Sequence, residues 1–127
     1  MKDAIHLCAA LGIVGYDHIE VYDTPQPLFG YHGDERPEKA HVIVRRQYVS
    51  GASNDLGFFK GEDGIYRAII SDYDSVKHDT SWMNRLKQGY AESRTIATAR
   101  AKGYVFQGRT VTQTANGPQV QLQFAVR

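Results

Sequence analysis

The spacing of hydrophobic residues predicts two helices of different length. Apolar residues at helical spacing precede Gly12 and predict a short helix over residues 2–11 that stops at that glycine. A longer apolar stripe, with Asp79 or Thr80 as the N-terminal cap, predicts a helix running to about Lys102, with Gly103 as its left-handed C-terminal residue. Gly89 lies inside this stripe and predicts a close packing contact.

Alternating and continuous apolar runs predict several strands between the helices. Residues 18–23, 41–46, 56–59 and 65–70 read as strands, the last two joined by a tight turn at Asp63-Gly64. Asp63 thus has a turn explanation, because an Asp-Gly pair supplies the positive φ that such turns need.

Prolines interrupt the pattern in two places. Pro25 and Pro27 limit pairing, so residues 28–31 are expected to form an edge strand or a bulge. Residues 33–39 are expected to form a polar, proline-broken loop. After the long helix, the pattern of residues 104–114 and 119–126 predicts a terminal hairpin with one buried and one solvent-exposed face.

Strands joined by short turns imply an antiparallel sheet, and amphipathic helices need an apolar surface to cover. We therefore expect one α+β domain over residues 1–127. It has two layers, with a mainly antiparallel sheet and the short N-terminal and long helices packed on one face. The uncovered face, with its tyrosines and glutamines, is the candidate contact surface.

Composition narrows the class of protein. The chain has 127 residues and a formal net charge of +1, which gives no general attraction to nucleic acid or to anionic membranes. No apolar run approaches the roughly 18 residues of a membrane helix. One cysteine, Cys8, allows neither an internal disulfide nor a paired metal site. These features predict a cytoplasmic protein without cofactor or metal.

The motifs of known chemistries are not found. The sequence has no Walker loop, no Gly-x-Ser-x-Gly elbow and no dinucleotide-binding fingerprint. The five histidines show no metal-ligand spacing, and His32, in a glycine-flanked loop beside Tyr31, is the best functional candidate among them. A basic strip including Arg45 could bind nucleic acid, with nearby tyrosines stacking on the bases, but a solvated strand face explains the same residues. The sequence therefore favours a non-catalytic protein.

Acids near the ends of the strands leave a question open. Asp55, Asp72 and Asp74 could form a carboxylate site, while turn and capping roles are commoner for aspartates in such places. Neither interpretation is excluded by the residues alone.

Seven short elements, in a fixed order over roughly residues 28–104, carry a family resemblance: Gly30-Tyr31-His32-Gly33, His41-Val42-Ile43-Val44, Asn54-Asp55-Leu56-Gly57-Phe58, Asp63-Gly64-Ile65-Tyr66, Asp72, Gln88-Gly89-Tyr90-Ala91 and Gly103. The set resembles a family of small proteins of unknown function from cyanobacteria, red-algal plastids and other bacteria, known as a hypothetical chloroplast reading frame. The resemblance implies no established activity, but it singles out the positions of Asp55 and Asp72.

The chain departs from this family at two points. Family members usually begin with a strand before the first helix, whereas Met1 opens directly into the predicted helix. The family often has an aromatic residue, commonly Trp, after the strand-ending aspartate, where this chain has Asp72-Tyr73-Asp74.

The leading interpretation is a binding domain that acts within a protein complex or a homo-oligomer. Its contact surface would be centred on residues 30–33 and 55–58 of the sheet. The alternative is a small-molecule or nucleotide-binding protein, even a weak hydrolase, with a site at the sheet rim. Together the two interpretations give these candidate binding residues: Tyr31, His32, Arg45, Asp55, Phe58 and Asp72.

Overall fold

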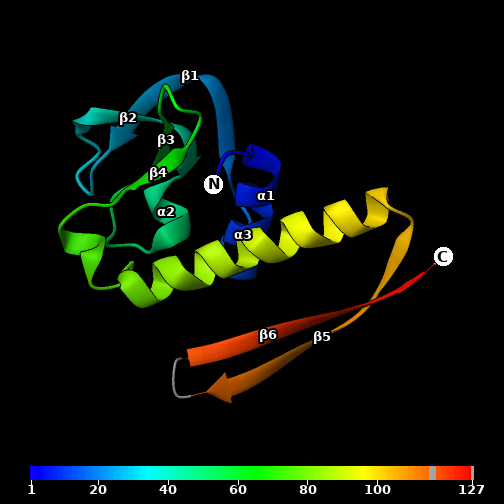
Figure 1. The fold of residues 1–127 in the computed structure, drawn as a ribbon. Coiled ribbons are helices and arrows are strands. Elements are labelled where there is room, and N and C mark those ends of the chain that lie inside the picture. Colours follow the sequence, from blue (N-terminus) through cyan, green and yellow to red (C-terminus); the bar gives the residue numbers. More distant parts are fainter. Residues whose placement is uncertain (115–116, 127) are drawn as a thin grey trace. The chain divides into compact units, whose positions relative to one another are not determined.

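A computed structural model describes residues 1–114 and 117–126, and the chain divides into two compact units, Met1–Tyr90 and Ala91–Arg127. The first unit contains the following elements: α1 (Ala4–Ile13), β1 (Glu20–Phe29), β2 (Glu35–Val44), α2 (Arg46–Val49), β3 (Leu56–Lys60), β4 (Tyr66–Ile69), the 3-10 turn η1 (Tyr73–Ser75) and the start of α3 (Thr80–Ala101). Its four strands form an antiparallel sheet in the order β1-β2-β3-β4 (Figure 1).

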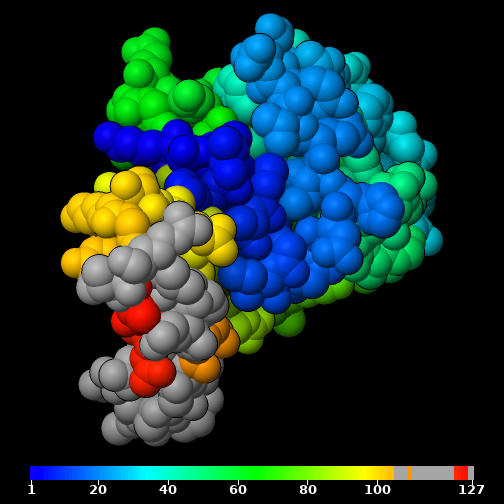
Figure 2. Space-filling view, turned by 90° about the vertical axis from the view of Figure 1, so that its right-hand side faces the viewer, coloured from blue at the N-terminus to red at the C-terminus, as the bar shows by residue number. Residues whose placement is uncertain are grey.

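The helices of the first unit cover one face of this sheet. Leu7 and Leu11 of α1 and Leu86 of α3 share one buried cluster with Val44 and Phe58 of the sheet. The predicted α+β class, with a short and a longer helix on one sheet face, is confirmed. α1 lies at the surface beside β1 (Figure 2), and its outer side leaves Ile5 and Ile13 exposed.

The helix ends follow the expected chemistry with one correction. Asp79 accepts a hydrogen bond from the Trp82 amide at 2.9 Å, which confirms the cap of α3. Gly103, at φ 86°, confirms its predicted end. Gly12 does not end α1, because the helix continues to Ile13 and Gly15 takes the left-handed conformation at φ 104°.

The expected loop at residues 33–39 is wrong, because β2 already begins at Glu35. This part of β2 pairs with β1, whereas β3 reaches β2 only from Val42 onward. The β1–β2 ladder is irregular between the residue pair Pro27–Lys39 and the pair Phe29–Glu35. Pro37 lies in this stretch. A residue without an amide proton is tolerated there, because no regular ladder bond needs its donor.

The second face of the sheet is not fully open, because β1 bends over it. Leu28 of β1 forms a small buried cluster with Ala40 and Ile43, and Tyr22 and Ile69 pack at its margin. A Cβ atom on Gly57 would lie 2.7 Å from the Ala40 Cβ. Glycine at this position therefore lets β1 approach the middle of the sheet.

The outer edge of β4 is in contact with the start of the chain. The Tyr66 amide donates a hydrogen bond to the Met1 carbonyl at 2.7 Å. Tyr90 fixes the same segment from α3, since its hydroxyl accepts hydrogen bonds from the amides of Lys2 and Asp3. The N-terminal residues are thus part of the packed unit.

The second unit contains the end of α3 and a hairpin of β5 (Tyr104–Thr114) and β6 (Gly117–Val126). These strands form a two-stranded antiparallel sheet with a register shift between Phe106 and Gly108, and they confirm the predicted terminal hairpin. Residues 115–116 of its expected turn lie outside the described residues. Arg109 of β5 makes a two-point ion pair with Glu92 of α3, with both nitrogen–oxygen distances at 2.9 Å.

Candidate functional site

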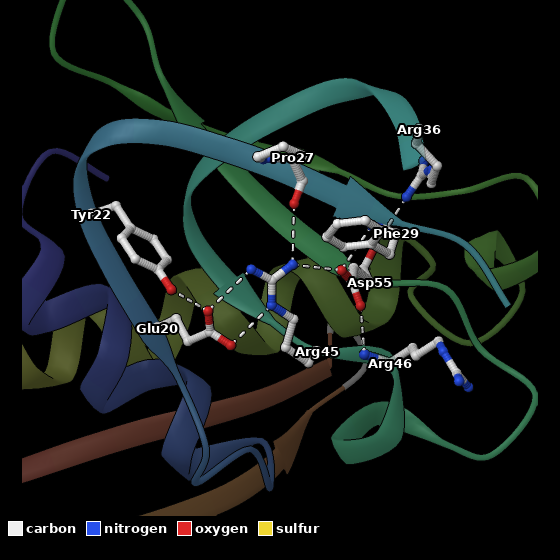
Figure 3. A network of polar contacts seen from close by, with 8 residues as sticks. All are labelled: Glu20, Tyr22, Pro27, Phe29, Arg36, Arg45, Arg46 and Asp55. Carbon is white, nitrogen blue, oxygen red and sulfur yellow. Dashed lines mark hydrogen bonds and ion pairs between the residues drawn. The ribbon is translucent and has the colours of Figure 1, made fainter. Parts of the chain in front are cut away.

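Arg45 and Asp55 form the centre of a polar network at the sheet margin (Figure 3). Arg45 follows the last residue of β2, and Asp55 precedes the first residue of β3, so the antiparallel pairing of these strands brings both side chains to one end. The Arg45 Nη1 donates to Asp55 Oδ2 at 2.8 Å. Of the predicted binding residues, this pair is brought into direct contact.

Asp55 is buried, and both of its carboxylate oxygens accept backbone hydrogen bonds. Its Oδ2 accepts from the Phe29 amide at 2.8 Å, and its Oδ1 accepts from the Arg46 amide at 2.7 Å. The Asp55 amide in turn donates to the Phe29 carbonyl at 3.0 Å. The carboxylate therefore joins the end of β1 to the start of α2.

Arg45 extends the network to the first residue of β1. Its Nε and Nη2 donate to the two oxygens of Glu20, and Nη1 also donates to the Pro27 carbonyl at 3.1 Å. The guanidinium lies over the ring of Phe29, 5.6 Å from its centre. Arg45 thereby ties both ends of β1 to the end of β2.

The charges in the network favour its ionised state. The hydrogen bond from Arg45 lowers the pKa of Glu20, and the Tyr22 hydroxyl donates to the same carboxylate. Burial alone would lower the pKa of Arg45, but its hydrogen bonds to Glu20 and Asp55 raise it above its usual value. The guanidinium is consequently a permanent cation with its acceptors already in place.

The other predicted residues lie in different settings. Tyr31 and His32 are exposed, and the centres of their rings lie 4.9 Å apart. Phe58 is fully buried in the core and supports the sheet from the helix side. Asp72 is exposed at the start of η1, where its carbonyl accepts from the Ser75 hydroxyl.

Tyr31 and His32 belong to a short loop, residues 30–34, which we call the Tyr31 loop. The Gly30 amide donates to the Asp34 carbonyl, and the Gly33 amide donates to the Gly30 carbonyl. The Tyr31 amide donates to Asn54 Oδ1 at 2.8 Å, which anchors the loop on the residue before Asp55. Three backbone donors thus hold the loop, while Tyr31 remains 48% exposed.

Asp74 differs from Asp72, although the sequence offers both as acids of one carboxylate site. Asp74 is buried, and its Oδ2 accepts from the Asn54 amide and the Ser71 hydroxyl. Asn54 Nδ2 also donates to the Ser71 hydroxyl. Asp74 therefore fixes the segment after β4 to the residue that anchors the Tyr31 loop.

Asp63 has the structural role that its Asp-Gly turn predicts. Its Oδ1 accepts from the Ile65 amide, and Gly64 takes φ 79°. A hydrogen bond from Arg67, together with the one from Ile65, lowers the pKa of Asp63 to about 2. Among the described residues, no group of three or more His, Cys, Asp or Glu side chains has the arrangement of a metal site.

Sequence reasoning did not identify Glu20, Asn54 or the backbone donors of the network. Glu20 sits in an ordinary alternating strand, and Asn54 precedes Asp55 without any spacing that marks it. Their roles depend on the bend of β1 and on the loop before β3. A signal that could have pointed to Asn54 is its place between a turn region and a strand, where Asn often bonds backbone amides.

The fold and the site define an antiparallel α+β protein with a polar network at the sheet margin. The family model named DUF1257, protein of unknown function, matches residues 14–118, and the chain belongs to this family. No curated protein and no solved structure shows significant similarity to the chain. Within the part of the chain that the structure describes, none of the helices has the length and apolarity needed to cross a membrane.

Proposed function

We propose that the protein is a non-catalytic interaction domain that acts in the cytoplasm, within a protein complex or a homo-oligomer. The Tyr31 loop is its contact surface, and the Arg45–Asp55 network is the support behind it. One observation carries this proposal: Arg45 and Asp55 of the predicted site bond each other, whereas Tyr31 is exposed.

The distribution of burial supports a contact surface better than a ligand site. Phe29 and Tyr31 expose 37% and 48% of their residue surface, and tyrosine is among the residues enriched at protein interfaces. Their backbone is fixed by Asp55 and Asn54, which lowers the ordering cost that binding imposes on a loop.

A small-molecule or nucleotide site at the sheet rim has less support. Such a site needs convergent polar groups that are free to bind the ligand. The Asp55 carboxylate accepts three hydrogen bonds within the unit, and three nitrogens of Arg45 donate to acceptors of the chain. A ligand would have to displace these bonds.

Matched substitutions at two tyrosines test the proposed contact. Tyr48 is 45% exposed, close to the exposure of Tyr31, and lies on α2 away from the Tyr31 loop in sequence. We expect Tyr31→Ala to reduce self-association or recovery of a co-purified protein at least tenfold, and Tyr48→Ala to leave it unchanged. Native mass spectrometry of the purified protein measures the oligomeric state and the co-purified masses.

Two outcomes would count against the proposal. Equal association of both variants would remove the Tyr31 loop from the contact. A small mass that is lost on denaturation, with a monomeric chain, would favour the ligand-binding alternative and identify the class of ligand.

A further inference from the structure

His78 lies in a buried aromatic cluster that neither the sheet margin nor the Tyr31 loop includes. His78 comes after η1 in the chain, and it is almost fully buried. Its Nε2 lies 2.7 Å from the Tyr16 hydroxyl, and its ring centre lies 4.4 Å from that of Trp82. The other ring nitrogen, Nδ1, is buried and has no hydrogen-bond partner among the described residues. One nitrogen is therefore satisfied and the other is not.

This arrangement suits a neutral imidazole and not a cation. A protonated histidine has two N–H donors, and the Nδ1 donor would be buried without an acceptor. Burial lowers the pKa of His78, Asp74 opposes this shift, and Lys77 adds to it. Tyr16 is held as a neutral phenol, because burial and then the charge of Asp74 raise its pKa. Tyr16, Asp74 and Lys77 are the titratable groups that the structure places against His78.

A continuous series of hydrogen bonds leads from His78 to the Tyr31 loop. The His78 amide donates to the Asp74 carbonyl at 2.8 Å. Asp74 Oδ2 accepts from the Asn54 amide at 3.0 Å, and Asn54 Oδ1 accepts from the Tyr31 amide at 2.8 Å. Asn54 thus contacts both the segment that carries His78 and the loop that carries Tyr31.

The same segment is also held from its other side. Lys77 Nζ donates to the Val49 carbonyl of α2 at 3.0 Å. By contrast, Tyr73 and Val76 of the segment are 67% and 84% exposed. The segment 71–79 is therefore attached through a few polar contacts and His78, with little apolar burial of its own between them.

We propose that His78 is a pH-sensitive lock: in its neutral form it holds segment 71–79 closed, and its protonation releases this segment and the Tyr31 loop together. This inference rests on the proposed function, because it makes the Tyr31 contact surface dependent on pH. The neutral ring avoids a buried donor without a partner when its proton is on Nε2, where the Tyr16 hydroxyl can accept it. Protonation then adds an Nδ1 donor that has no acceptor in the closed state. In the open state, water accepts from that donor.

The direction of the effect follows from proton linkage. In the open segment, His78 takes up a proton near its ordinary pKa of 6.5, whereas the closed state resists protonation. Opening is therefore favoured as the pH falls below 6.5. One pH unit below that value, a single histidine shifts the opening equilibrium by at most about tenfold.

Hydrogen–deuterium exchange of the free chain tests the lock. Exchange of peptides from residues 30–34 and 71–79 is measured at pH 7.5 and 5.5 and corrected for the intrinsic pH dependence. We expect both segments to exchange up to tenfold faster at pH 5.5, and His78→Gln to remove this difference. His18→Gln is the control, since this side chain is exposed and lies outside both probed segments, and it is expected to retain the response.

A second measurement needs no substitution. Trp82 is the single tryptophan of the chain and contacts His78, so its emission reports protonation of the neighbouring imidazole through quenching. We expect the midpoint of the emission change to coincide with that of the exchange response. This keeps the test valid if His78→Gln does not fold.

Three results would overturn the proposal. Exchange in segment 71–79 that does not change with pH would remove the lock. A response of this segment without one in the Tyr31 loop would remove the coupling, and a response retained in His78→Gln would assign it to another group. Since exchange is measured without a partner, it can succeed even if Tyr31→Ala shows that the loop makes no contact.

Discussion

Leu28 lies directly on Gly57: a Cβ atom at position 57 would be 2.9 Å from the Leu28 Cδ1 and 2.7 Å from the Ala40 Cβ. The bend of β1 over the sheet therefore depends on the missing side chain. We predict that Gly57→Ala lowers the free energy of unfolding by about 1–3 kcal/mol, because the buried neighbours must shift. Urea denaturation measures the change.

Gly51→Ala is the matched control, because a Cβ atom there meets nothing within 4 Å. Its stability is expected to lie within about 0.5 kcal/mol of the unsubstituted protein. If both variants were equally stable, the close approach of β1 to Gly57 would not be a packing constraint.

Removal of the buried carboxylate in the network should be costly. In Asp55→Ala, the amides of Phe29 and Arg46 lose their acceptor, and Arg45 loses its buried counter-charge. We predict a loss of about 3–5 kcal/mol in the free energy of unfolding, measured by urea denaturation. Asp63→Ala removes an ion pair and a turn hydrogen bond that are both exposed, so it should cost much less stability than Asp55→Ala. A similar loss in both variants would contradict the role assigned to Asp55.

The lowered pKa of Glu20 predicts how the free energy of unfolding depends on pH in the acid range. Because its pKa is lower in the folded protein than its usual 4.5, the unfolded chain binds its proton more readily. The stability contributed by Glu20 is thus present above pH 4.5 and is lost as the pH falls through its folded pKa.

Urea midpoints at pH 6 and pH 3.5 test this sign. Glu20→Gln should be less stable than the unsubstituted protein at pH 6, and the difference should shrink at pH 3.5. A difference that grew toward acid would reverse the assignment.

The second unit offers a test of its own at the Arg109–Glu92 pair. Glu92 is mostly buried, so Arg109→Ala leaves a carboxylate without its two-point partner. We predict a coupling of about 1 kcal/mol between Arg109→Ala and Glu92→Gln in a double-mutant cycle, since Arg109 is partly solvated. Hydrogen exchange of the β5 amides should rise in Arg109→Ala, and additive effects of the two substitutions would exclude the coupling.

The sequence predicts the fold well where local rules decide the outcome. The Asp79 cap, the Asp63-Gly64 turn and the end of α3 at Gly103 each depend on a few adjacent residues. The close contact expected at Gly89 is also found, since a Cβ there would lie 3.3 Å from the Ile13 Cδ1.

Predictions fail where pairing between distant segments decides. Residues 35–39 read as a loop because of Pro37, but pairing with β1 makes them part of a strand. The ion pair of Arg45 and Asp55 forms because β2 and β3 are antiparallel neighbours, which no spacing in the sequence records. The functional roles of Tyr31, His32 and Asp72 stay predictions.

The hydrogen bond from Tyr66 to the Met1 carbonyl has a practical consequence for protein engineering. A fusion partner or purification tag joined to Met1 begins at the outer edge of β4, where it can compete for the backbone of the sheet. A long polar spacer between Met1 and the tag keeps the tag away from this edge.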